Sequence, residues 1–148
     1  MAEFAPNAKL VLLTWNVDDM TGEDFGFAYD ALMSAGAREV YAIPIQMKKG
    51  RPGLEIHALC APEDEEKLVK AAFAHTTTFG IRRSETEAYA LARSCFVLNT
   101  DHGSVRVKIG EGFDITKSKL EYEDAARYAR EAGISMEEVR KRLNFPEK

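Results

Sequence analysis

The sequence is poor in cysteine and has no long apolar run. Only two cysteines occur, Cys60 and Cys95, and they stand far apart without a Cys-x-x-Cys pattern. This sparse usage is typical of reduced thiols in a cytoplasmic protein. No stretch approaches the roughly 20 apolar residues of a membrane-spanning helix, and residues 1–7 lack the charged-then-apolar layout of a secretion signal. We therefore expect a cytoplasmic protein with no membrane partner.

Several common functional motifs are also missing. The sequence contains no Walker loop, no Gly-x-Gly-x-x-Gly fingerprint and no nucleophilic triad. Its three histidines, His57, His75 and His102, show no zinc-type spacing to one another or to cysteine, which argues against a dedicated metal-storage site. The net charge of -4 argues against a nucleic-acid partner, although local basic clusters could still hold one small polyphosphate.

The apolar content, 45% of 148 residues, is sufficient for one domain with a core. The order of elements is strand-helix-strand-strand-helix-strand, which matches a ferredoxin-like βαββαβ sandwich of the α+β class. We expect this sandwich, with an added β-hairpin strand, at 8–109, and a linker with a C-terminal helical extension at 110–148. The pattern predicts strands at 9–17, 39–47, 54–60, 81–98 and 105–109, helices that begin near residues 21 and 62, and two more helices after residue 120.

Two adjacent carboxylates, Asp18 and Asp19, directly follow the first predicted strand. They are costly to place between a buried strand and a helix start unless something uses them. Hard divalent cations prefer oxygen ligands, and Mg²⁺ typically takes one or two carboxylates plus phosphate oxygens. We expect Asp18 or Asp19 to hold Mg²⁺ or Mn²⁺, which would bridge a nucleotide triphosphate. The alternative is that both, with Thr21, merely cap the helix that follows.

Three cations, Lys48, Lys49 and Arg51, lie on a turn that is punctuated by glycine and proline. A basic turn can fold over a polyphosphate, and the arginine fork offers two parallel hydrogen bonds. We expect these residues to bind the nucleotide. The alternative is a solvated hairpin tip.

A hydroxyl-rich segment lies between the second predicted helix and the strand after it. Short donors and a close backbone can wrap phosphate oxygens, so we expect Thr76, Thr77, Thr78 and Arg82 to contact a nucleotide. The alternative is a helix end that runs into a strand, with its arginines simply exposed.

A fourth group, Lys119, Glu121 and Tyr122, opens the C-terminal helical region. In a binding function the lysine would meet phosphate, the tyrosine would stack on or bond to a base, and an acid would support the metal. The alternative is that the acids there only favour the positive end of the helix.

Four segments, in this order, resemble the C-terminal domain of the LarC family. Three positions depart from the family pattern: Gln46 replaces an aromatic residue, His75 an acid, and Leu120 a proline. The segments are Asn-Val-Asp-Asp-Met-Thr-Gly-Glu at 16–23, Pro-Ile-Gln-Met-Lys-Lys-Gly-Arg-Pro at 44–52, His-Thr-Thr-Thr-Phe-Gly-Ile-Arg-Arg at 75–83 and Lys-Leu-Glu-Tyr-Glu-Asp at 119–124.

LarC proteins insert nickel into the pincer nucleotide cofactor of lactate racemase and consume CTP. The resemblance therefore implies an enzyme, a CTP-dependent nickel insertase (a nickel chelatase of the lyase class). Its partners would be CTP, pyridinium bisthiocarboxylic acid mononucleotide and Mg²⁺ or Mn²⁺, with nickel as the inserted metal. It also implies a homo-oligomer and an N-terminal LarC portion, without which this domain can be inactive. No catalytic residue is assigned.

A second function stays open. Ferredoxin-like domains also serve as small-molecule-binding regulatory modules or as oligomerisation modules without catalysis, because a fold alone does not settle function. A regulatory module predicts binding without nucleotide turnover. An oligomerisation module predicts stable assembly with no affinity for CTP.

Overall fold

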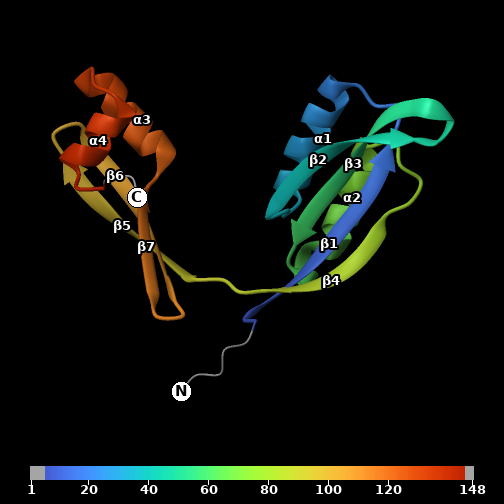
Figure 1. The fold of residues 1–148 in the computed structure, drawn as a ribbon, viewed down its shortest axis with the longest axis horizontal. Coiled ribbons are helices and arrows are strands. Elements are labelled where there is room, and N and C mark those ends of the chain that lie inside the picture. Colours follow the sequence, from blue (N-terminus) through green and yellow to red (C-terminus); the bar gives the residue numbers. More distant parts are fainter. Residues whose placement is uncertain (1–5, 146–148) are drawn as a thin grey trace. The chain divides into compact units, whose positions relative to one another are not determined.

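The computed structural model describes residues 6–145, which form two compact units. The division falls between Tyr89 and Ala90, so that the first unit ends with residue 89 and the second begins with residue 90 (Figure 1). Each unit has its own sheet, its own pair of helices and its own hydrophobic core.

The first unit is a ferredoxin-like sandwich, as predicted. Its four strands are antiparallel in the order β2-β3-β1-β4. The elements are β1 (Ala8–Val17), α1 (Gly22–Ser34), β2 (Glu39–Met47), the 3₁₀ turn η1 (Lys48–Gly50), β3 (Arg51–Cys60), the 3₁₀ turn η2 (Pro62–Asp64), α2 (Glu65–His75) and β4 (Arg82–Ala88).

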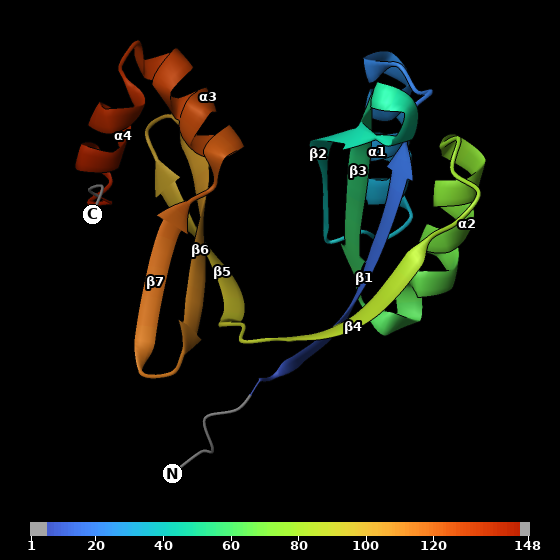
Figure 2. The same ribbon diagram turned by 45° about the vertical axis from the view of Figure 1, so that its right-hand side comes forward.

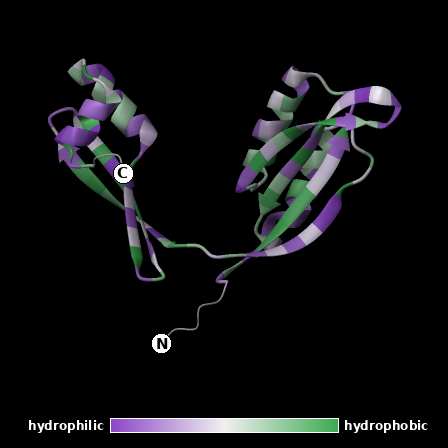
Figure 3. Cartoon of the chain, viewed as in Figure 1, coloured by the Kyte–Doolittle hydropathy of each residue, from purple (hydrophilic) through white to green (hydrophobic). Residues whose placement is uncertain are grey.

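Both helices of this unit pack on one face of the sheet (Figure 2). Trp15 and Leu13 of β1 are fully buried there with Ile56 of β3, Leu32 of α1 and Leu68 of α2. Side chains alternate across a strand, and the hydropathy of the strands is banded accordingly (Figure 3). The apolar run of β1 predicted burial on both faces. The structure instead leaves the second face of the sheet partly exposed, because α1 and α2, the helices of this unit, both pack on the other face.

The second unit contains a three-stranded antiparallel sheet, in the order β5-β6-β7, and two helices. Val105 of β6 packs against Ala125 and Tyr128 of α3 and Val139 of α4. Gly133, in the left-handed conformation, ends α3, and the Ser135 side chain caps α4. The elements are β5 (Ala92–Thr100), β6 (Gly103–Gly112), β7 (Ile115–Leu120), α3 (Tyr122–Ala132) and α4 (Met136–Arg142).

The structure differs from the sequence-based division at residues 8–109 and 110–148. The single strand predicted at 81–98 is two strands, β4 paired with β1 and β5 paired with β6. Residues 110–119, read as a linker, complete β6 and form most of β7. The hairpin therefore belongs with the C-terminal helices, because the buried side chain of Val105 packs on α3 within the second unit.

Arg127 of α3 holds the turn between β5 and β6. Its guanidinium donates to the carbonyl oxygens of His102, at 2.7 Å, and of Ser104. Gly103 lies between them with φ +82°, and a Cβ atom there would stand 2.6 Å from Arg127 Nη1. The positive φ favours glycine at this turn, and a side chain there would also displace the arginine guanidinium.

Across residues 6–145, no helix has the length and apolar character needed to cross a bilayer.

Candidate functional site

Several predicted site residues lie at one end of the first sheet. Val17 ends β1, Arg51 begins β3 and Arg82 begins β4. Because β3 and β4 both run antiparallel to β1, their starts lie beside the end of β1. The carboxyl end of α2 also leads, through the threonine segment, to the start of β4.

Asp18 and Arg51 form an ion pair at this end, with Arg51 Nη1 3.2 Å from Asp18 Oδ2. The aspartate side chain is 18% exposed and that of the arginine 56%. The structure therefore brings the first predicted carboxylate and the third cation of the basic turn into direct contact.

Gly53 makes this approach possible. A Cβ atom at Gly53 would lie 2.6 Å from both the Val17 carbonyl oxygen and Met47 Sδ. A residue with a side chain would push the β2–β3 hairpin away from the point where the chain leaves β1, and Arg51 away from Asp18.

Asp19 contacts a different element. Its carboxylate accepts a hydrogen bond from the Thr77 hydroxyl, in the loop after α2. The two aspartates thus link the end of β1 to two neighbours, the β2–β3 hairpin and the α2–β4 loop.

The helix cap is made by other groups than these aspartates. The Thr21 hydroxyl accepts from the Asp24 backbone N–H at 3.1 Å, and the Asp24 carboxylate accepts from the Thr21 backbone N–H at 3.1 Å. The Thr21 hydroxyl also donates to the Asp24 carboxylate at 2.7 Å. This side-chain bond, and after it the bond from the Thr21 backbone N–H, lowers the pKa of Asp24 below its ordinary value. Of the three residues in the capping alternative, Thr21 caps α1, whereas Asp18 and Asp19 bond elsewhere.

Lys48 and Lys49 lie in η1, at the tip of the β2–β3 hairpin, and both are exposed. Among residues 6–145 neither has an ion-pair partner. Lys49 adopts the left-handed conformation, with φ 61° and ψ 22°. This conformation costs a non-glycine residue about 1–2 kcal/mol.

The threonine segment divides into local and long-range contacts. Thr76 donates its hydroxyl to the Ala72 carbonyl, and Thr78 bonds to Gly80 in both directions. Thr77 alone of the three reaches the aspartates. A cavity of about 440 Å³ adjoins this segment and is lined by Met20, Asp24, Phe27, Ala74, His75, Thr76 and Thr77.

Arg82 reaches back over β1 and β3. Its Nη2 lies 2.9 Å from Asn16 Oδ1 and 3.0 Å from Glu55 Oε2. Asn16 and Glu55 face each other in the β1–β3 ladder. Sequence reasoning gave these two no role. The feature that could have identified Asn16 and Glu55 was a polar side chain on the exposed face of each of two neighbouring strands.

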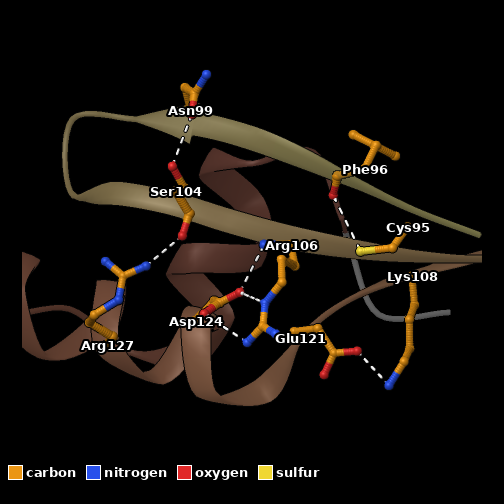
Figure 4. A network of polar contacts seen from close by, with 9 residues as sticks. All are labelled: Cys95, Phe96, Asn99, Ser104, Arg106, Lys108, Glu121, Asp124 and Arg127. Carbon is orange, nitrogen blue, oxygen red and sulfur yellow. Dashed lines mark hydrogen bonds and ion pairs between the residues drawn. The ribbon is translucent and has the colours of Figure 1, made fainter.

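The fourth predicted group lies in the second unit. Lys119, Glu121 and Tyr122 all line one cavity of about 390 Å³ at the start of α3. Glu121 pairs with Lys108 of β6 (Figure 4), and this contact lowers the pKa of the glutamate. Tyr122 is 68% exposed. The three residues are therefore gathered as a group, on a unit separate from that of the aspartates.

The donor set at the end of β1 fits a hard divalent cation only in part. No group of three or more histidine, cysteine, aspartate or glutamate side chains suited to a metal occurs within residues 6–145. Asp18 and Asp19 each supply hard oxygen donors, on neighbouring residues that contact different elements. Such a pair suits Mg²⁺ or Mn²⁺ when phosphate and water oxygens complete the shell, and does not form a full protein cage.

Comparison with known proteins identifies the family. The family model described as nickel insertion protein matches residues 2–140. The pyridinium-3,5-bisthiocarboxylic acid mononucleotide nickel insertion protein of Acetivibrio thermocellus is 37% identical over 136 residues, covering 92% of this chain and 33% of its own length. The protein of that name from Alkaliphilus metalliredigens is also 37% identical, over 86% of this chain and 30% of its length. The chain thus spans about a third of these relatives.

Two solved structures share the fold. One is LarC2, the C-terminal domain of a cyclometallase involved in the synthesis of the NPN cofactor of lactate racemase, in its apo form. It matches with a TM-score of 0.83 at 33% identity, covering 92% of this chain and 94% of the domain. The other is a protein of Methanopyrus kandleri AV19, with a TM-score of 0.69, 25% identity and coverage of 88% and 81%. The chain therefore belongs to the nickel insertion protein family, and its match within that family is the LarC C-terminal domain.

Proposed function

We propose that this chain binds CTP together with Mg²⁺ or Mn²⁺ and serves nickel insertion into the lactate racemase cofactor. The substrate would be the pyridinium bisthiocarboxylic acid mononucleotide named in its relatives. The observation that carries the proposal is that two contacts, Asp18 with Arg51 and Asp19 with Thr77, lie at the end of the first sheet where Arg82 begins β4.

Each of these groups has a task that its geometry supports. Arg51 is more exposed than its partner Asp18, so a triphosphate can compete for the guanidinium and leave the carboxylate available to a cation. The exposed Lys48 and Lys49 add positive charge at the hairpin tip. A divalent cation, when bound, would neutralise phosphate charge. Transfer of this type depends on positioning and charge neutralisation more than on a protein nucleophile.

The reaction implied by the family is activation of the substrate by a cytidylyl group, with release of pyrophosphate, followed by nickel insertion. Nickel is cargo here, and the chain's own residues hold and orient the nucleotide. Since the chain spans about a third of its relatives, we propose that an N-terminal LarC portion supplies the remaining functions. We also propose that the protein forms a homo-oligomer and is located in the cytoplasm.

The test is a thermal-shift series with CTP, ATP, GTP and UTP, each with and without Mn²⁺. A ligand that binds only the folded state raises the melting temperature by mass action. We expect CTP with Mn²⁺ to give the largest rise, and Asp18→Asn with Asp19→Asn to remove it. Glu85→Gln, a carboxylate change on β4 away from these groups, is the matched control. Equal responses to all four nucleotides, or an unchanged response in the double variant, would overturn the proposal.

A further inference from the structure

The face of the first sheet opposite α1 and α2 carries a continuous series of polar contacts. Arg82 Nη2 lies 3.0 Å from Glu55 Oε2, and Glu55 Oε1 lies 2.9 Å from His57 Nε2. His57 Nδ1 in turn lies 3.5 Å from the Thr14 hydroxyl. The residues come from β1, β3 and β4, so three strands contribute to one network.

The imidazole ring of His57 is held in place by its surroundings. Its side chain is 13% exposed and its ring stacks on Tyr41, with centroids 4.6 Å apart and planes at 6°. A carboxylate oxygen that faces a ring N–H accepts its hydrogen bond, so His57 Nε2 donates to Glu55, while Nδ1 faces the Thr14 hydroxyl. The histidine therefore holds one oxygen of Glu55 in place.

The second carboxylate oxygen of Glu55 accepts a hydrogen bond from Arg82. Both N–H groups of Arg82 Nη2 are then engaged, one by Glu55 and one by Asn16. A guanidinium has five N–H donors, so those on Nε and Nη1 remain to meet a ligand. The arginine side chain is 59% exposed. The arrangement anchors the guanidinium at one nitrogen and presents its other two.

We propose that Glu55 is a positioning residue that orients Arg82 toward phosphate. This inference rests on the proposed nucleotide function. A carboxylate near a polyanion lowers affinity by simple Coulomb repulsion. A Glu55 that instead raises affinity must act through the arginine that it holds. The two effects have opposite signs, so one substitution separates them.

The test is Glu55→Gln, with CTP affinity measured by calorimetry in the presence of Mn²⁺. Positioning predicts weaker binding, by about fivefold to tenfold, in the range of measured couplings between contacting residues. Removal of the charge alone predicts tighter binding. In an Arg82→Ala background, Glu55→Gln should no longer weaken binding. Glu85→Gln is the matched control, because Glu85 pairs with the neighbouring Arg83 at 3.0 Å.

Asn16→Ala is a second variant that changes no charge and removes the other anchor of Arg82. It should also weaken CTP binding while the melting temperature without ligand stays within a few degrees of the parent. Tighter or unchanged binding in Glu55→Gln, with the aspartate variants still defective, would overturn the positioning role and leave the proposed function standing. Absence of CTP binding by the parent chain would overturn both.

Discussion

At the scale of single residues, Asp124 of α3 is the carboxylate whose pKa is lowered furthest among residues 90–145. It accepts from the Arg106 backbone N–H at 2.9 Å, from Nε at 2.7 Å and from Nη2 at 3.3 Å (Figure 4). The arginine side chain, and after it the backbone N–H, lowers the pKa of Asp124 from its ordinary 3.8 to about 2. One carboxylate thus ties the start of α3 to β6.

This pair predicts a pH dependence of stability. Because the pKa is lower in the folded chain, the contact stabilises it above about pH 4 and is lost as the pH falls through about 2. Asp124→Asn should therefore be less stable than the parent at pH 7, and the difference should shrink between pH 4 and pH 2. Urea unfolding at several pH values measures this. A difference that stays constant down to pH 2 would contradict the assignment.

Trp15 predicts a second result at this scale. The side chain is fully buried in the first core, and within residues 6–145 its Nε1 has no hydrogen-bond partner. An unpaired buried donor costs about 1–3 kcal/mol. Trp15→Phe removes that cost along with some packing, so we expect it to lower the unfolding free energy by only about 1–2 kcal/mol, against about 3–5 for Trp15→Ala. Urea unfolding of both variants tests the ranking.

At the scale of elements, the β2–β3 hairpin tip combines backbone strain with charge. Lys49 occupies the left-handed conformation within the three-residue turn that joins β2 to β3, and such strain often accompanies function. Asparagine tolerates this conformation well. Lys49→Asn should thus preserve the melting temperature while lowering CTP affinity about threefold to tenfold, the range expected for one charge pair in partly exposed surroundings. Lys70→Gln on α2 is the control cation, and equal affinity in both variants would contradict a role for the tip.

Element boundaries show where sequence reasoning succeeded and failed. The first unit was predicted because strong breakers, such as the Gly-Arg-Pro-Gly stretch at 50–53, separate its elements. The break between β4 and β5 contains no glycine or proline, so it read as continuous strand. The β6–β7 hairpin turns through Phe113 and Asp114, both with positive φ. That turn type usually carries Asn-Gly or Asp-Gly, and the Phe-Asp pair gave no signal.

The candidate site was predictable by residue type but not by pairing. Asp18 and Arg51 could be chosen from their neighbours in the sequence. That they bond to each other, and that Glu55 and Asn16 hold Arg82, depends on strand register and on which face packs against the helices. Those features follow from tertiary packing, which decides register by burial of one face.

At the scale of the whole molecule, two units with separate cores should unfold separately. The second core consists of Val105, Ala125, Tyr128, Ala129 and Val139, two of them alanines. A small core of this kind supplies little stability, because small domains bury less of their surface. Calorimetry should show two transitions, with the second unit melting first. A fragment of residues 6–89 should reproduce the higher transition, and a single two-state transition of the whole chain would contradict this.

Gly103 and Arg127 lie far apart in the sequence, but both determine the structure of the β5–β6 turn. A methyl group at Gly103 would displace the Arg127 guanidinium and break its hydrogen bonds to the carbonyl oxygens of His102 and Ser104. After a substitution at either Gly103 or Arg127 has removed these hydrogen bonds, a substitution at the other should lower the stability little further. Substitutions at Gly103 therefore depend on the residue at position 127 of α3. We expect Gly103 and Arg127 to be retained together or replaced together in related sequences.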